Sequence, residues 1–184
     1  MDDKTLIERL KSDQTRNLAF HELIKRYEKR VYHHIRKMVI DHDDTDDLVQ
    51  ETFVKVFEHL DHFREESRLY TWIYRIATNE ALSFLSKKKR RAWLLLQNYS
   101  SQLSQKAEAH VLLDGDAMQA MLQKALLSLP DKQRLVFNMK YYDDMTYKEI
   151  SAVLGTSVGA LKASFHHAVK KIEAHLGSSL NQTP

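Results

Sequence analysis

Histidine and carboxylate side chains that could bind a metal ion gather in the first quarter of the chain. His33, His34, His42 and Asp43 include an adjacent His–Asp pair, a pairing typical of helical metal-dependent phosphohydrolases. No further ligand set is spaced around this pair, and His occurs 10 times in the chain, so metal-dependent hydrolysis is a weak hypothesis. The overlapping segment 41–45 lacks the glycine and the spaced glutamate of an EF-hand. The sequence therefore predicts no catalytic residue, no metal site and no cofactor.

Acidic and basic residues are segregated along the chain. The carboxylates of one stretch are Asp41, Asp43, Asp44, Asp46, Asp47 and Glu51. An unbroken basic run, KKKRR, occupies residues 87–91. Acids favour helix starts and bases favour helix ends, so solvated helix termini would explain both runs. The functional alternative is a surface for a basic partner in the first stretch and a surface for phosphate in the second.

The segment 145–176 has the pattern of a helix-turn-helix. Thr146 and Glu149 form a Thr-x-x-Glu capping box, which predicts the start of the first helix. Gly155 supplies the turn that ends this helix, and Ser157 caps the second helix. The apolar arc of the second helix consists of Val158, Leu161, Phe165, Ala168, Val169 and Ile172.

The opposite arc of that second helix carries small and basic side chains, namely Gly159, Ala163, His166, His167 and Lys170. Small side chains allow close approach, and a helix with one buried stripe and such an outer face suits a DNA major groove. An ordinary amphipathic helical hairpin remains the alternative for this segment taken alone.

Composition narrows the class of protein. A chain of 184 residues with 43% hydrophobic content can form one or two domains with real cores. With only 4 Gly and 2 Pro, it is expected to be mostly helical, and the absence of Cys excludes disulfides and cysteine nucleophiles. No apolar run approaches a membrane span, and the charged N-terminus is unlike a signal peptide. We therefore expect a soluble, cytoplasmic protein that does not insert into a membrane.

Apolar periodicity predicts an all-α chain, with helices over residues 3–11, 17–39, 45–60 and 69 to about 88 in its first half. The second of these has a core stripe of Phe20, Leu23, Ile24, Tyr27, Val31, Ile35 and Met38. The third buries Val49, Phe53, Val56 and Leu60, which leaves Asp47, Glu51, Val54 and Glu58 on a candidate contact surface. The fourth packs Trp72, Ile73, Ile76 and Ala77 inward and directs Arg75, Asn79, Leu82 and Ser86 along a stripe that can face DNA.

The periodic pattern weakens between residues 92 and 117, and this segment is predicted to be a linker with some helical content. Its apolar cluster at residues 93–96 is expected to dock on a neighbouring surface. Helices over residues 117–129 and 131–141 then join the helix-turn-helix in a second, smaller helical domain, with Pro130 at a helix start.

Four short motifs, in order along the chain, carry a family resemblance. They are DLVQETF at residues 47–53, YTWIYRIATN at 70–79, LPDKQR at 129–134 and YKEI at 147–150. Together they resemble the extracytoplasmic-function (ECF, group IV) sigma factors of the sigma-70 family, which serve bacterial RNA polymerase. The resemblance implies two helical domains: a sigma-2 domain over residues 1–91, a linker over 92–117 and a sigma-4 domain over 118–184, with no sigma-3 domain between them.

The resemblance also implies roles for residues of the first domain. Docking on core RNA polymerase, at the beta-prime coiled coil, is expected of Asp47, Gln50, Glu51 and Phe57. Capture and reading of the separated minus-10 strand, with phosphate contacts nearby, are expected of Phe63, Arg64, Ser67, Arg68, Arg75, Asn79, Ser83, Lys87, Lys88, Arg90 and Arg91. Stacking and base-edge hydrogen bonds would compensate the cost of extruding a base.

In the second domain, the positions that resemble the minus-35 reading surface are Lys148, Ser157, Gly159, Lys162, Ala163, Ser164, His166, His167 and Lys170. The family commonly has arginines where Ser164 and His167 stand, so the usual minus-35 preference does not transfer to this chain.

The function that the resemblance implies is that of a noncatalytic specificity subunit. It would dock on core polymerase, including its beta subunit, bind the minus-35 duplex and open the minus-10 strand of promoter DNA. It is expected to be a monomer when free and to be covered by an anti-sigma factor. A plain helix-turn-helix regulator with a ligand-sensing domain is the alternative, but it leaves the surfaces at 47–53 and 72–79 without a role.

Overall fold

The computed structural model describes residues 2–98 and 117–180, and over these ranges the chain forms helices and connecting turns without any strand. The chain divides into two compact units, Met1–Ser104 and Gln105–Pro184. The all-α, two-domain fold class predicted from sequence is confirmed. Across the same two ranges, no helix is both long and apolar enough to span a bilayer.

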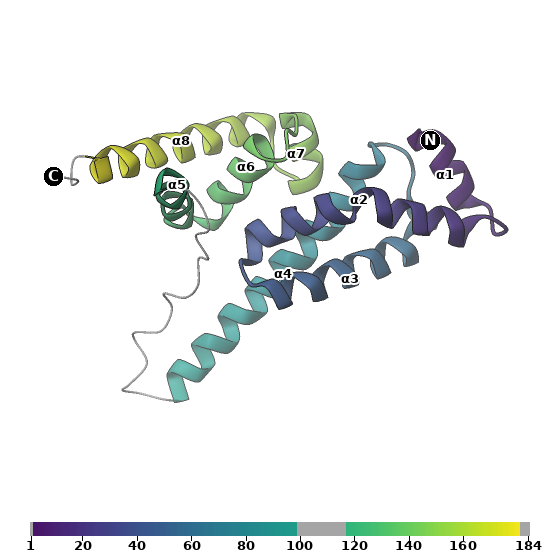
Figure 1. Cartoon of the computed structure of the whole chain (residues 1–184), viewed down its shortest axis with the longest axis horizontal. Coiled ribbons are helices and arrows are strands. Elements are labelled where there is room, and N and C mark those ends of the chain that lie inside the picture. Colours follow the sequence, from purple (N-terminus) through teal and green to yellow (C-terminus); the bar gives the residue numbers. More distant parts are fainter. Residues whose placement is uncertain (1, 99–116, 181–184) are drawn as a thin grey trace. The chain divides into compact units, whose positions relative to one another are not determined.

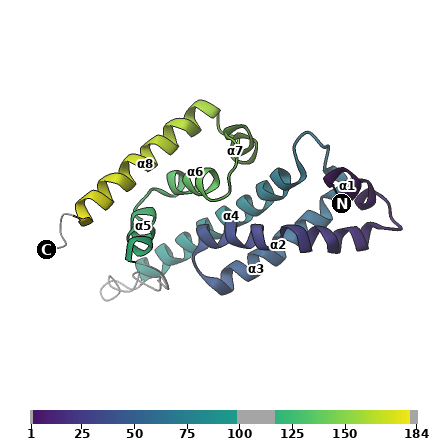
Figure 2. The same cartoon turned by 45° about the horizontal axis from the view of Figure 1, so that its top comes forward.

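The first unit is built from α1 (Asp3–Lys11), α2 (Arg16–Val39), α3 (His42–Glu58), the short 3₁₀ helix η1 (Leu60–His62) and α4 (Leu69–Asn98). Helices α2, α3 and α4 pack against one another, and α1 packs on α2 (Figures 1 and 2). Fully buried side chains from all four α-helices fill the centre, among them Leu6, Leu23, Val31, Ile35, Val56, Ile73 and Ala77. This core decides which side of α3 and of α4 faces outward.

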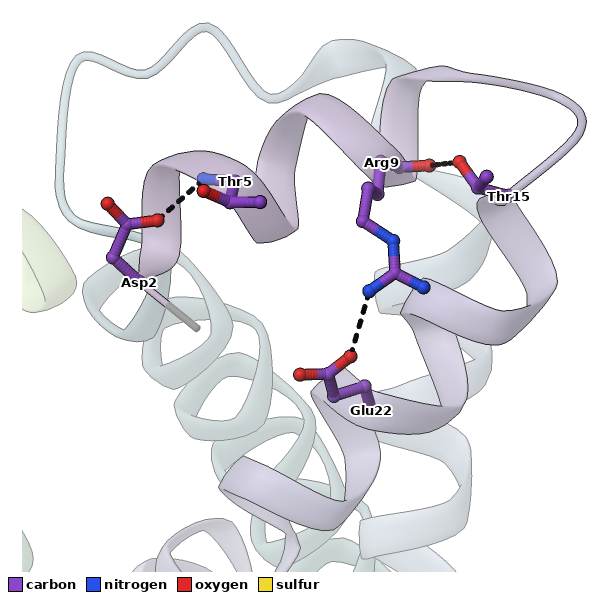
Figure 3. A network of polar contacts seen from close by, with 5 residues as sticks. All are labelled: Asp2, Thr5, Arg9, Thr15 and Glu22. Carbon is purple, nitrogen blue, oxygen red and sulfur yellow. Dashed lines mark hydrogen bonds and ion pairs between the residues drawn. The ribbon is translucent and has the colours of Figure 1, made fainter.

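Polar contacts cap the start of α1 and tie its end to α2 (Figure 3). Asp2 caps α1, because its carboxylate accepts a hydrogen bond of 2.9 Å from the backbone N–H of Thr5. At the other end Arg9 pairs with Glu22 of α2 at 3.1 Å, and the Thr15 hydroxyl donates to the Arg9 carbonyl oxygen at 2.8 Å. These contacts fix α1, whose last residue, Lys11, pairs with Glu65 in the loop over residues 63–68.

Asp3 adds a partly buried contact between the same two helices. It accepts hydrogen bonds from the Arg26 guanidinium at 2.8 Å and from the Tyr27 hydroxyl at 2.9 Å. Burial of the phenol, and then its hydrogen bond to the negative Asp3, raise the pKa of Tyr27 to about 12. Tyr27 therefore stays neutral over the physiological range.

Two helices of the first unit have bounds that differ from the prediction: α3 is shifted and ends at Glu58 rather than at residue 60, and α4 is longer. Helix α3 starts at His42 rather than at residue 45, because Asp41 acts as its N-cap and accepts a hydrogen bond of 3.0 Å from the N–H of Asp44. Helix α4 continues to Asn98 rather than ending near residue 88. Its added segment AWLLLQN contains good helix formers and no Gly or Pro that would stop it. The side chains of the apolar cluster at 93–96 lie outside the described residues.

The second unit contains α5 (Ala117–Leu127), α6 (Asp131–Tyr141), α7 (Tyr147–Leu154) and α8 (Val158–Leu180). Helix α8 packs against α5, α6 and α7 (Figures 1 and 2). The buried cluster that joins α5, α6 and α8 is Ala125, Leu126, Leu129, Phe137, Ala168 and Ile172. The apolar arc predicted for α8 is thus its packing face.

The turn between α7 and α8 has the predicted construction. The Thr146 hydroxyl accepts from the Glu149 N–H, while the Glu149 carboxylate accepts from the Thr146 N–H at 2.7 Å, which completes the capping box. Gly155 ends α7 with φ of 63°, a conformation that glycine adopts without strain. The Ser157 hydroxyl then accepts from the N–H of Ala160 at 3.3 Å and caps α8.

Candidate functional site

The outer side of α3 carries acidic and apolar side chains together. We call this surface the α3 face; its exposed members are Asp47, Gln50, Glu51, Val54 and Glu58. Val54 is 57% exposed among these carboxylates. An exposed valine beside charged groups offers both apolar contact and charge complementarity, so the α3 face is suited to a basic partner with apolar side chains.

A groove of about 630 Å³ lies beside the α3 face, between α2 and α3. Its lining is Phe20, Ile24, Glu28, Val49, Gln50, Phe53, Val54, Phe57 and Glu58. A second hollow of about 550 Å³ shares Glu28, Val49 and Gln50 with it and extends toward Tyr32, His33 and Asp46. Two of the docking positions predicted on α3, Gln50 and Phe57, therefore line a groove whose other wall is α2.

The contribution of α2 to this groove was not predicted from the sequence. Phe20 and Ile24 belong to the apolar stripe assigned to the core, but both are only half-buried. Phe57, predicted as a docking residue, is also half-buried, and its ring meets Phe20 edge-on at 4.8 Å. The Arg16 guanidinium lies 5.3 Å from the centre of the same ring. Phe57 is therefore part of the groove wall rather than a protruding side chain.

Phe63, assigned from the sequence to the minus-10 strand, is buried in the free protein, and its role there stays a prediction. Its side chain is 6% exposed and its ring lies 5.1 Å from that of Trp72, so it offers no open face on which a base could stack. Apolar contact with α4 holds the ring inward. Arg64 and Arg68, which follow it in the loop, are exposed, and Ser67 is half-buried. In this structure the Phe63 ring packs against α4 beneath the surface of the loop, and the ring must move before it can contact a base.

The loop over residues 63–68 is held by two ion pairs that sequence reasoning missed. Lys11, at the end of α1, pairs with Glu65 in the loop, and Arg16 pairs with Asp61 of η1 at 3.1 Å. Glu65 has φ of 60°, an uncommon conformation for a residue other than glycine. These partners are 54 and 45 residues apart in sequence, so no local pattern would have revealed them.

The outward stripe of α4 agrees with the prediction. Arg75, Asn79, Leu82, Ser83 and Ser86 are all exposed, while Ala77 and Ala81 of the same helix are completely buried. Lys87, Arg90 and Arg91 continue the exposed surface as a positive end. We call the set Arg75, Asn79, Leu82, Ser83 and Ser86 the α4 stripe. Hydrogen-bonding side chains on this stripe are followed along α4 by the cationic side chains of the basic run.

Lys88 differs from its neighbours in the basic run. Its ammonium group lies 2.6 Å from a carboxylate oxygen of Asp44 in the first turn of α3, and 5.5 Å from the centre of the Phe84 ring. The pKa of the nearby Asp41 is lowered, first by the backbone N–H of Asp44 and also by the positive charge of Lys88. Lys88 therefore has a carboxylate partner in Asp44, and its contact with a phosphate stays a prediction.

The histidines that suggested metal chemistry have other contacts. His34 is 1% exposed, with Nε2 at 2.9 Å from the Thr78 hydroxyl and its ring 4.6 Å from that of Tyr74. His42 lies with Nδ1 at 2.9 Å from the Tyr32 hydroxyl. Over the described ranges, no three His, Asp or Glu side chains converge as a metal site would require.

Helix α8 presents the predicted outer face of the second unit. Gly159, Lys162, Ala163, His166, His167 and Lys170 are exposed on α8, as are Lys148 of α7 and Ser157 at the turn, whereas Ser164 is half-buried. A Cβ on Gly159 would meet nothing within 4 Å, so packing within the unit does not require a glycine there. The ammonium of Lys162 lies 6.0 Å from the Tyr147 ring, at the outer limit of a cation–π contact.

The inner side of α8 is fixed by aromatic packing. Phe165 stacks on Phe137 with ring centres 5.6 Å apart and meets the Tyr147 ring edge-on at 6.4 Å. His166 and His167 follow Phe165 and project from the exposed side, with ring centres 6.1 Å apart. The outer face is therefore a rigid surface of small and basic groups, which is the form in which a recognition helix enters a major groove.

Comparison with known families and proteins agrees with this arrangement. Sigma-70 region 2 matches residues 23–91, and Sigma-70, region 4 matches residues 119–172. The ECF RNA polymerase sigma-E factor of Escherichia coli (strain K12) is 31% identical over 180 residues, covering 93% of this chain and 92% of the relative. The ECF RNA polymerase sigma factor SigW of Bacillus subtilis (strain 168) is 28% identical over 166 residues, covering 86% and 89%.

Solved structures share the fold. CnrH, in complex with the cytosolic domain of CnrY, is similar with a TM-score of 0.69 and 26% identity, covering 96% of this chain and 97% of the other. The sigma factor RpoE from Bartonella quintana, in complex with the anti-sigma factor NepR, is similar with a TM-score of 0.70 and 23% identity, covering 86% and 96%. With a region 2 match on the unit that carries the α3 face and the α4 stripe, and a region 4 match on the helix-turn-helix, the chain belongs to the family of ECF RNA polymerase sigma factors.

Proposed function

We propose that this sigma factor, whose family function is to direct RNA polymerase to promoters and initiate transcription, works through three surfaces. The α3 face and its groove dock on core polymerase, the α4 stripe with its loop holds the minus-10 strand, and the outer face of α8 reads the minus-35 duplex. The observation that carries the proposal is that one small helical unit exposes both the α3 face and the α4 stripe.

Docking combines charge with apolar contact. Asp47 and Glu51 would pair with basic side chains of the beta-prime coiled coil, while Val54 and the ring of Phe57 would meet its apolar side chains. Contact with the beta subunit would follow from the same assembly. Desolvation of the groove by a partner would favour binding, and the carboxylates would select a basic partner.

Promoter contacts divide between positioning and reading. Asn79 and Ser83 on the α4 stripe would hydrogen-bond exposed base edges, with Arg64, Ser67, Arg68 and Arg75 around the captured strand. Lys87, Arg90 and Arg91 would hold phosphates nearby. On the minus-35 duplex, Lys162, His166 and Lys170 would approach the major groove, which Gly159 and Ala163 leave accessible. The half-buried Ser164 would contribute least.

Sigma factors are initiation factors rather than enzymes, and we propose that this chain has no catalytic activity of its own. Phosphodiester bond formation would belong to the core polymerase, in the cytoplasm.

We further propose that the sigma-2 domain spans residues 1–91, the linker 92–117 and the sigma-4 domain 118–184. We also propose that an anti-sigma factor binds this chain, since RpoE of Bartonella quintana is solved in complex with one. It would occupy the groove between α2 and α3 and so block docking on core polymerase.

Titration of the full chain with core RNA polymerase tests the proposal. Nanomolar association, followed by promoter-dependent transcripts in vitro, is the expected result. A chain that binds promoter duplex but not core polymerase would instead be a plain helix-turn-helix regulator. Metal-dependent release of phosphate without either activity would revive the phosphohydrolase alternative.

A further inference from the structure

The ion pair between Asp44 and Lys88 joins an acidic helix start to a basic helix segment. The two charged atoms are 2.6 Å apart, and the side chains are 28% and 55% exposed, so the pair is open to solvent and to ligands. The Phe84 ring lies beneath the same ammonium group at 5.5 Å. Lys88 is therefore held in one place by two partners rather than projecting freely.

A second carboxylate strengthens the negative field at this point. Asp41, the N-cap of α3, accepts the N–H of Asp44, and its pKa is lowered by that hydrogen bond first and by Lys88 as well. A lowered pKa keeps Asp41 negative at neutral pH. Lys88 thus contacts the Asp44 carboxylate directly and also lies within the electrostatic influence of Asp41 at the start of α3.

The residues around Lys88 on α4 are the proposed phosphate contacts. Lys87, Arg90 and Arg91 are exposed within one turn of it. A phosphate that reaches this turn meets Lys87, Arg90 and Arg91, with the exposed Lys89 among them, whereas Lys88 is bound to Asp44. Release of Lys88 requires breaking the ion pair, which reduces the net gain from a phosphate contact at Lys88.

We propose that Asp44 is an affinity-setting residue of the promoter interface: its carboxylate occupies the place of a DNA phosphate at Lys88 and weakens sequence-independent binding. The inference rests on the proposed promoter contacts of region 2. Its consequence is that promoters are chosen less by general attraction to phosphate and more by base contacts along the α4 stripe.

The test measures promoter affinity of the complete holoenzyme against salt for Asp44→Asn. Each phosphate contact changes the slope of log affinity against log salt by about 0.9. Asp44→Asn is expected to steepen the slope by about one such contact and to tighten binding about twofold to fivefold at low salt. A misfolded variant would lose affinity, so a gain cannot come from unfolding.

Asp43→Asn is the matched control, because it removes the same charge from the same exposed helix turn without breaking the pair. Lys88→Gln should leave the wild-type slope nearly unchanged and should cancel the effect of Asp44→Asn in the double variant. Equal slopes for wild type and Asp44→Asn, or equal gains for Asp43→Asn and Asp44→Asn, would overturn the inference alone. Failure of the wild-type holoenzyme to assemble or to bind promoter would overturn the proposed function, and this inference with it.

Discussion

The two units present their candidate DNA-contacting residues in different states. In the first unit, Phe63 is buried against Trp72, and Lys88 is bound to Asp44. In the second unit, the corresponding candidates Lys162 and His166 lie outward on one helix, whose inner side is fixed by packing. The first unit therefore has candidate contacts that are buried or already paired, whereas the candidates of the second unit are exposed.

This difference matches the two tasks proposed for the units. Reading a duplex requires side chains of fixed geometry on a rigid helix, because the major groove is already formed. Holding a separated strand requires contacts that become available only when a base leaves the stack. The comparison therefore predicts that the second unit binds duplex without rearrangement, while the first depends on polymerase and on movement of its loop.

The largest effect is expected from removing the docking charges of the first unit. Asp47→Ala with Glu51→Ala should weaken core polymerase binding about a thousandfold or more, because each lost partner of a buried interface charge costs about 2 to 5 kcal/mol and each 1.4 kcal/mol is about tenfold in affinity. Both residues are exposed, so the free energy of unfolding should change by less than about 0.5 kcal/mol for each. Fluorescence titration with core enzyme measures the loss.

Glu8→Ala with Asp13→Ala is the control for this variant, since it removes two exposed carboxylates of the same unit that lie outside α3. Minus-35 duplex binding by the free chain should be unchanged in both variants. Normal core binding by the Asp47 and Glu51 variant would place the docking surface elsewhere.

A smaller effect should separate Asn79 from Phe63. Asn79→Ala removes an exposed base-edge contact, so opening at minus-10 should weaken by about 1 to 3 kcal/mol with stability unchanged. Phe63→Ala should impair opening as well, but it should also destabilise the first unit by about 3 to 5 kcal/mol, because the ring is buried. Permanganate footprints and thermal unfolding report the two quantities.

Asn17→Ala, the same chemical change at an exposed position of α2, should alter neither quantity. Phe63→Leu, which keeps most of the apolar volume, should restore stability and leave only the aromatic contribution to be measured. If thymine reactivity stays normal in both Asn79→Ala and Phe63→Leu, the minus-10 assignment of this surface is wrong.

How far the sequence predicts the structure differs between local and tertiary features. Thr146, Gly155 and Ser157 form their contacts with residues close to them in sequence. The capping box, the glycine turn and the serine cap predicted for them are all present in the structure. Periodicity also predicts which sides of α3 and α8 are exposed. It does not predict where α4 ends, because a helix stops where a breaker or the surrounding structure stops it.

The missed features of the candidate site all depend on which helices meet. Phe20 reads as a core residue until α3 is placed beside it and leaves a groove. The partner of Lys88 is 44 residues away in sequence. Charge runs and apolar stripes identify surfaces, but pairings between surfaces come from the tertiary arrangement.

The positive end of α4 should contribute affinity without sequence preference. Lys87→Gln with Arg90→Gln should lower the slope of log affinity against log salt by about 0.9 for each lost phosphate contact. The choice among promoters should not change, because phosphate contacts position the protein and do not specify bases. Lys4→Gln with Lys25→Gln, which changes the net charge equally at exposed positions of α1 and α2, is the control. A changed promoter preference with an unchanged slope would show that these residues read bases.

The smallest effect on DNA affinity is expected in the second unit, where two histidines lie on the outer face of α8. His166 and His167 are exposed, and protonation of an imidazole adds a positive charge and a second donor. Binding that favours the protonated form must strengthen as pH falls, so minus-35 duplex affinity should rise about twofold to fivefold from pH 7.5 to 6. Binding of the full chain to a minus-35 duplex, measured against pH, should give a flatter curve for His166→Gln with His167→Gln, while His21→Gln, exposed on α2, should follow the wild type. Parallel curves for wild type and the double variant would mean that these histidines pack or face solvent without binding DNA, and the second unit would then read its duplex with Lys162 and Lys170 alone.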